Sequence, residues 1–130
     1  MALSEVLGKL RYRREVGGVA VNAPPYISAT LKVEGFSDGF RVEKSTFTLI
    51  FIRDKAELAV LLPETLPRVE PDSLLWVLYP RNGSKIATDL NRDIVWDLAE
   101  PLGIKPVAQV AFDSNWSAMR FRLTEKVNAK

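Results

Sequence analysis

The sequence predicts a single α/β domain, a three-layer sandwich in which helices cover both faces of a mainly parallel sheet that ends in an antiparallel β-hairpin. Three observations predict this fold class. Runs typical of buried strands alternate with segments of helical period, which favours parallel strands joined by right-handed crossovers. The chain has 130 residues, about the size of one domain. Its last two strand-like runs flank a turn-forming segment.

Four apolar runs are expected to form the main, parallel strands. The clearest is TFTLIFIR, which is apolar on both pleat faces, as a strand covered on both sides should be. The hairpin adds a last strand, Ser117–Leu123, which we expect at the edge of the sheet. Residues 36–44 fit either a loop or a weak edge strand. The main strands are predicted at Val19–Asn22, Thr46–Arg53, Ser73–Tyr79 and Pro106–Phe112.

Two short helices are expected in the first third of the chain. Ser4 is a candidate N-cap for the first helix, whose apolar residues at helical spacing are Leu3, Val6, Leu7 and Leu10. The second helix is predicted from Pro25, which suits a first turn, to a stop at Gly35. Its shared face is expected to hold Tyr26, Ile27, Thr30 and Leu31.

Two longer helices are expected after the second and third strands. Asp54 should cap the first of them, which Pro63 and Pro67 are expected to break and whose apolar face holds Ala56, Leu58, Ala59, Leu61 and Leu62. Thr88 should cap a helix running from Asp89 to Leu102, with Gly103 as its C-terminal cap. We expect the domain to span residues 1–125 and residues 126–130 to be a frayed tail.

Composition excludes several kinds of chemistry. The chain contains no cysteine and no histidine, which leaves out disulfides, Cys/His and Ser-His-Asp catalysis and ordinary zinc sites, so no metal site is expected. No stretch approaches the ~20 apolar residues of a membrane helix, and the first residues lack the apolar core of a signal peptide. The sequence therefore predicts a cytoplasmic protein without a membrane partner.

Charge gives little support for nucleic-acid binding. The net charge is +2 and the isoelectric point near 9.0, whereas strong binders concentrate basic residues in a patch. One local concentration exists, at Lys9, Arg11, Arg13 and Arg14, and it fits a solvated connector better than a phosphate-binding segment.

The polar residues that follow the strands form the candidate site. Ligands of open α/β sheets bind beyond the carboxyl ends of the parallel strands, and these ends meet at one edge. The candidate binding residues at that edge are Asn22, Arg53, Asp54, Tyr79, Arg81, Ser84, Lys85, Asp113 and Trp116. No catalytic residue is assigned.

The segment from Tyr79 to Asp93 is the richest part of this edge. Gly83 allows a sharp turn, Ser84 and Lys85 offer a hydroxyl and an ammonium group, and free amides at the start of the Asp89 helix would attract an anion. The pattern is no P-loop, because it lacks the earlier glycine. An ordinary exposed loop before a capped helix explains the same residues and remains the simpler interpretation.

No cofactor is expected. The architecture is a reduced Rossmann-like sandwich, and its terminal hairpin resembles the end of class I methyltransferase folds. The loop after the first strand, however, contains Asn22, Ala23, Pro24, Pro25 and Tyr26 without a glycine-rich turn, where backbone amides normally approach a dinucleotide or adenosyl cofactor.

The three tryptophans predict different roles. Trp76 lies inside a predicted buried strand and should belong to the core. Trp96 falls away from the stripe of Leu90, Ile94 and Leu98 and should face outward, as an anchor for a partner or a second copy of the chain, or under a neighbouring loop. Trp116 either covers the candidate site or pins the hairpin turn.

The chain also resembles a family of small bacterial proteins known only as a domain of unknown function. The resemblance rests on WVLYPRNGSK, then TDLNRD, then LGIKPVAQVAFDSNWSAMRFR, and on VAVNAP near the start. Arg81 stands where lysine is common in that family. The resemblance implies the Rossmann-like α/β fold and a bacterial cytoplasmic setting, and it implies no activity.

Three functions stay open at this point. The leading hypothesis is a non-enzymatic module that binds a small anion or a protein partner through Arg53, Arg81 and Lys85. The rival is an enzyme derived from a nucleotide-handling or methyltransferase-like fold that uses Asp54, Tyr79 or Asp113. The third is weak nucleic-acid binding through Arg11, Arg13, Arg14, Arg120 and Arg122.

Overall fold

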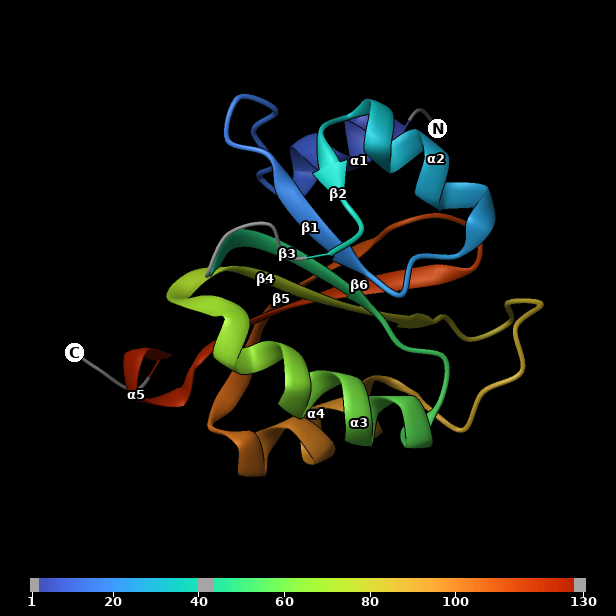
Figure 1. Cartoon of the computed structure of the whole chain (residues 1–130). Coiled ribbons are helices and arrows are strands. Elements are labelled where there is room, and N and C mark those ends of the chain that lie inside the picture. The colour runs from blue at the N-terminus through green and yellow to red at the C-terminus, as the bar shows by residue number, and fades with distance from the viewer. Residues whose placement is uncertain (1–2, 40–43, 128–130) are drawn as a thin grey trace.

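A six-stranded mixed sheet forms the centre of the molecule in a computed structural model, which describes residues 3–39 and 44–127 (Figure 1). The strands are β1 (Gly18–Val21), β2 (Phe36–Ser37), β3 (Ser45–Phe51), β4 (Val69–Pro80), β5 (Ile104–Ala111) and β6 (Trp116–Leu123). Their order in the sheet is β2-β1-β3-β4-β6-β5. β1 to β4 are parallel, and β6 is antiparallel to both β4 and β5, so β5 runs in the same direction as β4.

Helices cover both faces of the sheet (Figure 1). The elements are α1 (Leu3–Lys9), α2 (Pro25–Val33), α3 (Lys55–Thr65), α4 (Arg92–Ala99) and a C-terminal turn, α5 (Thr124–Val127). Apolar side chains of α1 and α2 pack on one face, and those of α3 and α4 pack on the other. The fold class predicted from the sequence, a single α/β domain with a terminal antiparallel hairpin, is confirmed.

Apolar side chains that alternate along the central strands contribute to the hydrophobic core on each face of the sheet. Leu49 and Phe51 of β3 face the α1/α2 side, whereas Ile50 and Ile52 face the α3/α4 side, and all four are fully buried. The strand has no solvent-facing side because successive side chains point to opposite faces and each face carries a helix layer. Trp76 of β4 belongs to the α1/α2 core, as predicted, and is 2% exposed.

The position of the antiparallel strand differs from the prediction. β6 was expected at the edge of the sheet, but it lies between β4 and β5, with pairs from Leu75↔Phe121 to Pro80↔Trp116. A hairpin sequence defines the pairing of β5 with β6 and leaves open which of the two adds to the free edge of β4. Because β6 takes that edge, the parallel strand β5 is the outermost strand.

The start of α4 is also corrected. Thr88 does not cap it: the helix begins at Arg92, and the Asn91 side chain accepts from the Ile94 amide at 2.9 Å. A 3-10 turn, Glu100–Leu102, follows α4, and Gly103 ends it in a left-handed conformation with φ 84°. Val95 and Ala99 provide the buried face of α4, whereas Leu98 of the predicted apolar stripe is exposed.

The buried apolar faces of α2 and α3 contain fewer residues than predicted. In α2, Ile27 and Leu31 are buried, but Tyr26 and Thr30 are exposed. Asp54 caps α3 as predicted, with its carboxylate accepting from the Glu57 amide at 2.8 Å. The helix continues through Pro63 to Thr65, although Pro63 has no amide hydrogen to donate to the Ala59 carbonyl one turn earlier. Leu58 and Leu62 bury its core face, whereas Ala56 and Ala59 are exposed.

The segment that the sequence left undecided and the predicted C-terminal tail have the following structure. Phe36–Ser37 forms β2, a short parallel edge strand on β1, while residues 40–43 of the undecided segment lie outside the described residues. At the other end, Thr124–Val127 is helical, so residues 126 and 127 of the predicted tail belong to α5, and 128–130 lie outside the described residues. Across the residues that the structure describes, no helix has the length and apolar character needed to cross a membrane.

Candidate functional site

The carboxyl ends of β1, β3, β4 and β5 meet at one edge of the sheet, as the sequence predicted for parallel strands. The structure divides the predicted site residues at this edge into three groups. Asn22, Arg53 and Asp54 belong to a hydrogen-bond network, Tyr79, Arg81 and Ser84 line a cavity, and Asp113 and Trp116 build the hairpin turn. Lys85 is exposed and joins none of these groups.

Asn22 ties the ends of β1 and β3 together. Its backbone is left-handed, with φ 61°, a conformation that asparagine adopts more readily than most residues. The side-chain amide donates to the Phe51 carbonyl at 2.9 Å and to the Glu57 carboxylate at 3.2 Å. Asn22 therefore has a structural role: it fixes the β1–α2 loop, at the position that a glycine-rich turn occupies in dinucleotide-binding sheets.

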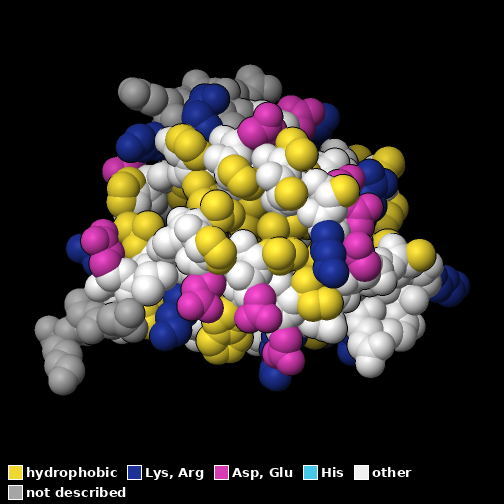
Figure 2. Space-filling view, turned by 90° about the horizontal axis from the view of Figure 1, so that it is seen from below, with side chains coloured by type: hydrophobic (Ala, Val, Ile, Leu, Met, Phe, Trp, Pro, Cys, Tyr) yellow, Lys and Arg dark blue, Asp and Glu magenta, His cyan; other side chains and the backbone are white. Residues whose placement is uncertain are grey.

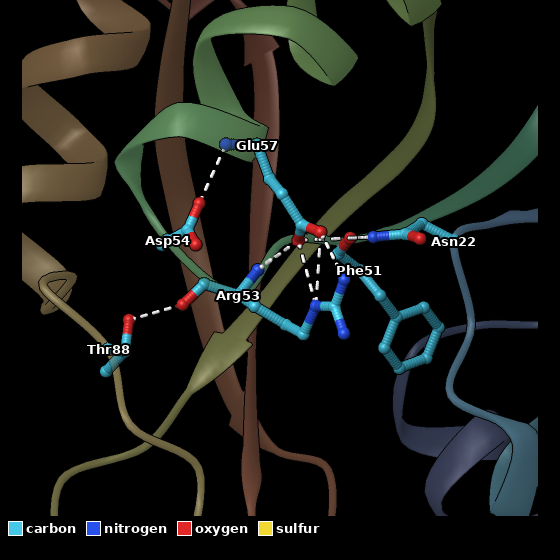
Figure 3. A network of polar contacts seen from close by, with 6 residues as sticks. All are labelled: Asn22, Phe51, Arg53, Asp54, Glu57 and Thr88. Carbon is cyan, nitrogen blue, oxygen red and sulfur yellow. Dashed lines mark hydrogen bonds and ion pairs between the residues drawn. The ribbon is translucent and has the colours of Figure 1, made fainter.

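Glu57 is the centre of the network and was not among the predicted site residues (Figure 3). Its carboxylate accepts from the Arg53 amide at 2.8 Å and from the Arg53 guanidinium at 2.6 Å. The sequence held a signal for it: Asp54 and Glu57 have the spacing of a capping box, and Arg53 and Glu57 are four residues apart.

Ionisation of the network follows from the Arg53–Glu57 pair. The hydrogen bond from Arg53 lowers the pKa of Glu57 against the opposing effect of burial, and the same bond raises the pKa of Arg53. Both side chains are therefore charged at neutral pH. Because the guanidinium of Arg53 is already paired with a carboxylate, Arg53 has less attraction for an external anion than the sequence suggested.

Two aspartates share the start of α3. Asp54 accepts from the Glu57 amide, and Asp89 from the β4–α4 loop accepts from the Lys55 amide, each at 2.8 Å. Thr88 donates its hydroxyl to the Arg53 carbonyl and thereby connects the same loop to the network. These carboxylates saturate amides of a helix N-terminus and are not placed as free acids or bases.

A cavity of about 230 Å³, here called the β2 cavity, lies beside the ends of β1 and β2. Asp38, directly after β2, lines it and forms an ion pair with Lys32 of α2 at 3.2 Å. Asn22 lines the same cavity from the end of β1. A carboxylate, an amide and an ammonium group thus face one small space where the first two strands end.

A larger cavity of about 570 Å³, here called the β4 cavity, lies under the β4–α4 loop. Arg81 and Arg92 line it, together with polar groups from Ser84, Thr88 and Gln109. Arg53 and Lys85, which the sequence placed beside Arg81, do not line it. Arg92 is the basic residue that sequence reasoning missed here, because the predicted helix placed it on a solvated face.

Tyr79 forms the floor of the β4 cavity. Its hydroxyl accepts a hydrogen bond from the Gln109 side-chain amide at 2.8 Å. Burial raises the pKa of Tyr79, so the phenol stays protonated well above neutral pH. Tyr79 is available to a ligand as a neutral hydroxyl.

Asp113 organises the hairpin turn. One carboxylate oxygen accepts from the Asn115 and Trp116 amides, both at 2.8 Å, and the other accepts from the Tyr26 hydroxyl at 2.9 Å. The guanidinium of Arg81 donates to the Asp113 carbonyl at 3.2 Å. Asp113 therefore caps the turn and holds α2 and the β4 end against it.

The two remaining tryptophans differ in exposure. Trp116 is 1% exposed and stacks edge-on against Phe51, with ring centroids 5.2 Å apart, so it pins the turn and does not cover the site. Trp96 of α4 is 38% exposed and lines a shallow groove of about 210 Å³ with Val107 and Gln109 of β5. Trp96 thus faces outward in part and lies over the edge strand.

The groups needed for a metal site do not assemble in the described part of the chain. No cluster of three or more aspartate, glutamate, histidine or cysteine side chains occurs among residues 3–39 and 44–127. Figure 2, seen from the α3/α4 side, shows basic and acidic side chains interspersed over that face, with apolar side chains between them.

The fold has counterparts among solved structures. LepI in complex with SAH and a substrate analogue, as a cysteine-to-alanine variant, matches with TM-score 0.56 and 14% identity over 92% of this chain and 39% of LepI. LepI in complex with SAM matches with TM-score 0.51 and 12% identity over 95% of this chain and 47% of LepI. The chain therefore spans less than half the length of these structures.

Sequence comparison adds no relative. The chain matches no protein-family model, and no curated protein matches it. The resemblance to a bacterial family of unknown function stays a prediction. At the identities found, the likeness to LepI concerns the fold alone, a mixed α/β sheet with helices on both faces.

Proposed function

We propose that the chain is a binding unit for an adenosyl compound of the SAM and SAH class, held in the β2 cavity. The observation that carries this proposal is the position of Asp38, a carboxylate in a cavity at the ends of β1 and β2. In related sheets, a carboxylate at the end of the second strand accepts hydrogen bonds from ribose hydroxyls. The likeness in fold to LepI, solved with SAM and with SAH, supports the same ligand class.

The β1–α2 loop favours a ligand without a diphosphate. Pro24 and Pro25 carry no amide hydrogen, and the Ile27 and Ser28 amides already donate to the Pro24 carbonyl at 3.0 and 2.9 Å. The start of α2 therefore offers few of the amides that bind a pyrophosphate in dinucleotide-binding sheets. SAM and SAH carry no diphosphate and need no such amides.

Asp38 is able to exchange the ammonium group of Lys32 for a ligand. The Lys32 and Asp38 side chains are 56% and 67% exposed, and ion pairs that exposed contribute little to stability. Ribose hydroxyls can replace the ammonium group at the carboxylate at small cost. Lys32 is then free to turn toward the solvent.

Calorimetric titration with SAH, SAM and adenosine tests the proposal. We expect SAH to bind and to raise the melting temperature, and NAD to do neither. Asp38→Asn should weaken SAH binding by about tenfold, because a charged acceptor for the ribose is lost. The matched control is Asp97→Asn, an exposed carboxylate of α4, which should bind SAH as the wild type does. An absence of SAH binding, or an equal loss in both variants, would overturn the proposal.

A second candidate function is the binding of a small anion in the β4 cavity. Arg81 and Arg92 line this cavity from opposite ends of the β4–α4 loop, and Tyr79 lines it as well. Two guanidinium groups beside a neutral hydroxyl suit a carboxylate or phosphate group. This second candidate is the leading hypothesis from the sequence with a changed set of basic residues: Arg92 takes the place of Arg53 and Lys85 beside Arg81.

A panel of phosphorylated and carboxylated metabolites tests this second candidate by thermal shift. We expect the double variant Arg81→Ala/Arg92→Ala to lose a shift that the wild type shows. Lys85→Ala removes a charge from the same loop outside the cavity and should keep the shift. Equal behaviour of the two variants, or no shift with any ligand of the panel, would contradict anion binding here.

The proposal stops at binding. Asp54 caps α3 and Asp113 caps the hairpin turn, so neither of these candidate acids of the enzyme hypothesis is free, and Tyr79 is a neutral hydroxyl. A bacterial cytoplasmic setting is part of the proposal and rests on the family resemblance. Contact with a protein partner or a second copy through Trp96 stays a prediction.

A further inference from the structure

Three arginines and one aspartate gather on the α1/α2 side of the sheet, away from the carboxyl ends of the parallel strands. They are Arg11, two residues after the end of α1, Arg120 and Arg122 of β6, and Asp72 of β4, and we call them the arginine cluster. The sequence separates Arg11 from Arg120 by most of the chain. Their proximity is a product of the fold.

The core positions Arg11 beside Arg120. The indole of Trp76 donates to the Leu10 carbonyl at 3.1 Å, which fixes the end of α1 over β4. Trp76 and Arg120 are directly opposite each other in the β4–β6 register. Arg11 follows Leu10, so the buried Trp76 anchor brings its backbone over the strand pair that carries Arg120.

The two arginines of β6 differ in their partners. Arg122 donates through Nε and Nη2 to the two carboxylate oxygens of Asp72, at 2.8 and 2.9 Å. In Arg120 the Nε is buried and has no acceptor. Buried polar nitrogens nearly always have a partner, so an unpaired Nε in a half-buried guanidinium calls for an explanation.

The charge balance of the cluster is positive. Asp72 is engaged by Arg122, which leaves the charges of Arg120 and Arg11 without a paired carboxylate in the cluster. The pKa of Arg120 is lowered, first by burial and then by the charges of Arg11 and Arg122. An anion placed between Arg11 and Arg120 would relieve this repulsion.

Backbone strain occurs at the same place. Arg11 and Asp72 both have left-handed backbones, with φ of 68° and 58°. Residues other than glycine adopt this conformation at a cost of order 1 kcal/mol, and such positions concentrate at functional sites. Two of the chain's left-handed non-glycine residues thus belong to one cluster.

We infer that the arginine cluster binds a phosphate group between Arg11 and Arg120, with Arg122 and Asp72 fixing the side of the site. A phosphate matches the planar guanidinium donors, which bind it through paired hydrogen bonds. Arg13 of the same basic segment is no part of the site: Arg11, and not Arg13, is among the charges that lower the pKa of Arg120, and the Arg13 guanidinium lies against Glu15 at 2.9 Å. The bound phosphate can belong to a small molecule or to a nucleic-acid backbone.

Titrations of the full chain with pyrophosphate, inorganic phosphate and a single-stranded oligonucleotide test this inference. We expect pyrophosphate to bind and to raise the melting temperature. Arg120→Met keeps the alkyl stem and removes the charge, and Arg11→Ala removes the exposed partner. Each should weaken binding by at least about tenfold. Arg13→Ala, which removes an equal charge from the same segment, should bind as the wild type does.

The outcomes separate the two sources of phosphate. Binding of pyrophosphate assigns the site to a small molecule, and binding of the oligonucleotide alone, with a steep fall in salt, assigns it to nucleic acid. Both support the site when Arg11→Ala loses affinity and Arg13→Ala does not. An equal loss in Arg11→Ala and Arg13→Ala, or no binding of any of the three compounds, overturns it. Because Arg11 is exposed, its variant keeps this test valid even where Arg120→Met does not fold.

Discussion

Asn22 and Thr88 lie at the two ends of one chain of hydrogen bonds that passes through Glu57 and Arg53 (Figure 3). Asn22 lines the β2 cavity and Thr88 lines the β4 cavity. The network therefore connects one lining residue of each candidate binding cavity. Changes within it are expected to affect the stability of the whole carboxyl edge.

Replacement of Glu57 should destabilise the protein in a pH-dependent way. Glu57→Gln removes the charged acceptor of the Arg53 amide, and we expect the free energy of unfolding to fall by about 1–2 kcal/mol at neutral pH. Most of this loss should come from the amide contact, because Arg53 is 60% exposed and its ion pair is screened by solvent.

The pH profile has a defined direction. The pKa of Glu57 is lowered in the folded state, so its stabilisation is complete above the ordinary range of glutamate and is lost as the pH falls through the lowered value. In urea unfolding, the free energy of unfolding of Glu57→Gln should fall less steeply between neutral and acidic pH than that of the wild type. Glu64→Gln, on the exposed side of the same helix, should keep the wild-type profile.

Removal of either aspartate at the start of α3 should have similar effects. Asp54→Ala and Asp89→Ala each leave one amide of the first turn without an acceptor, and we expect a loss of about 1 kcal/mol for each. Asp97→Ala, at an exposed position of α4, should change stability by less than about 0.5 kcal/mol. A neutral effect of Asp89→Ala would show that the β4–α4 loop is not docked on α3.

Truncation of the two tryptophans outside β4 should separate a core residue from a surface residue. Trp116→Ala opens a cavity beside Phe51 and should cost about 3–5 kcal/mol. Trp116→Phe should cost less, because it also removes a buried indole nitrogen that has no acceptor. Trp96→Ala should cost less than Trp116→Ala in urea unfolding, and equal losses would contradict the burial described above.

Alanine at two glycines should have opposite effects on stability. Gly83 has φ 83°, so Gly83→Ala should lower the free energy of unfolding by about 1–2 kcal/mol, although no atom would contact the new methyl group. Gly8 lies in α1 with open space around it, and Gly8→Ala should raise stability by up to about 1 kcal/mol. Thermal or urea unfolding of the two variants measures whether the free energy of unfolding falls in Gly83→Ala and rises in Gly8→Ala.

Local signals in the sequence were sufficient for most of the elements. The run TFTLIFIR predicted a strand buried on both faces because its alternating residues are apolar throughout, and β3 has this structure. Asp54 predicted the start of α3, since an N-cap acts on amides two or three residues away. Thr88 failed as the same kind of signal: its hydroxyl accepts from the Leu90 amide at 3.0 Å and donates to the Arg53 carbonyl, but the helix begins only at Arg92.

The site was predicted less completely than the fold. The rule that parallel strands end at one edge placed Asn22, Arg53 and Arg81 correctly at that edge, because strand direction follows from helical crossovers. It did not indicate which side chains would neutralise one another. Glu57 engages Arg53, and Arg92 lines the cavity of Arg81, and both relationships depend on where α3 and α4 begin.

The sequence alone determined most of the strands and helices, because hydrophobic period, caps and turn residues act over a few neighbouring residues. The tertiary structure alone decided that β6 lies between β4 and β5 and that Arg11 lies beside Arg120. Either strand of the hairpin could form the same backbone hydrogen bonds with β4, so no single residue specifies which of them is its neighbour. The packing of both faces of the sheet selects β6. The resulting strand order brings together charged residues that are far apart in the sequence.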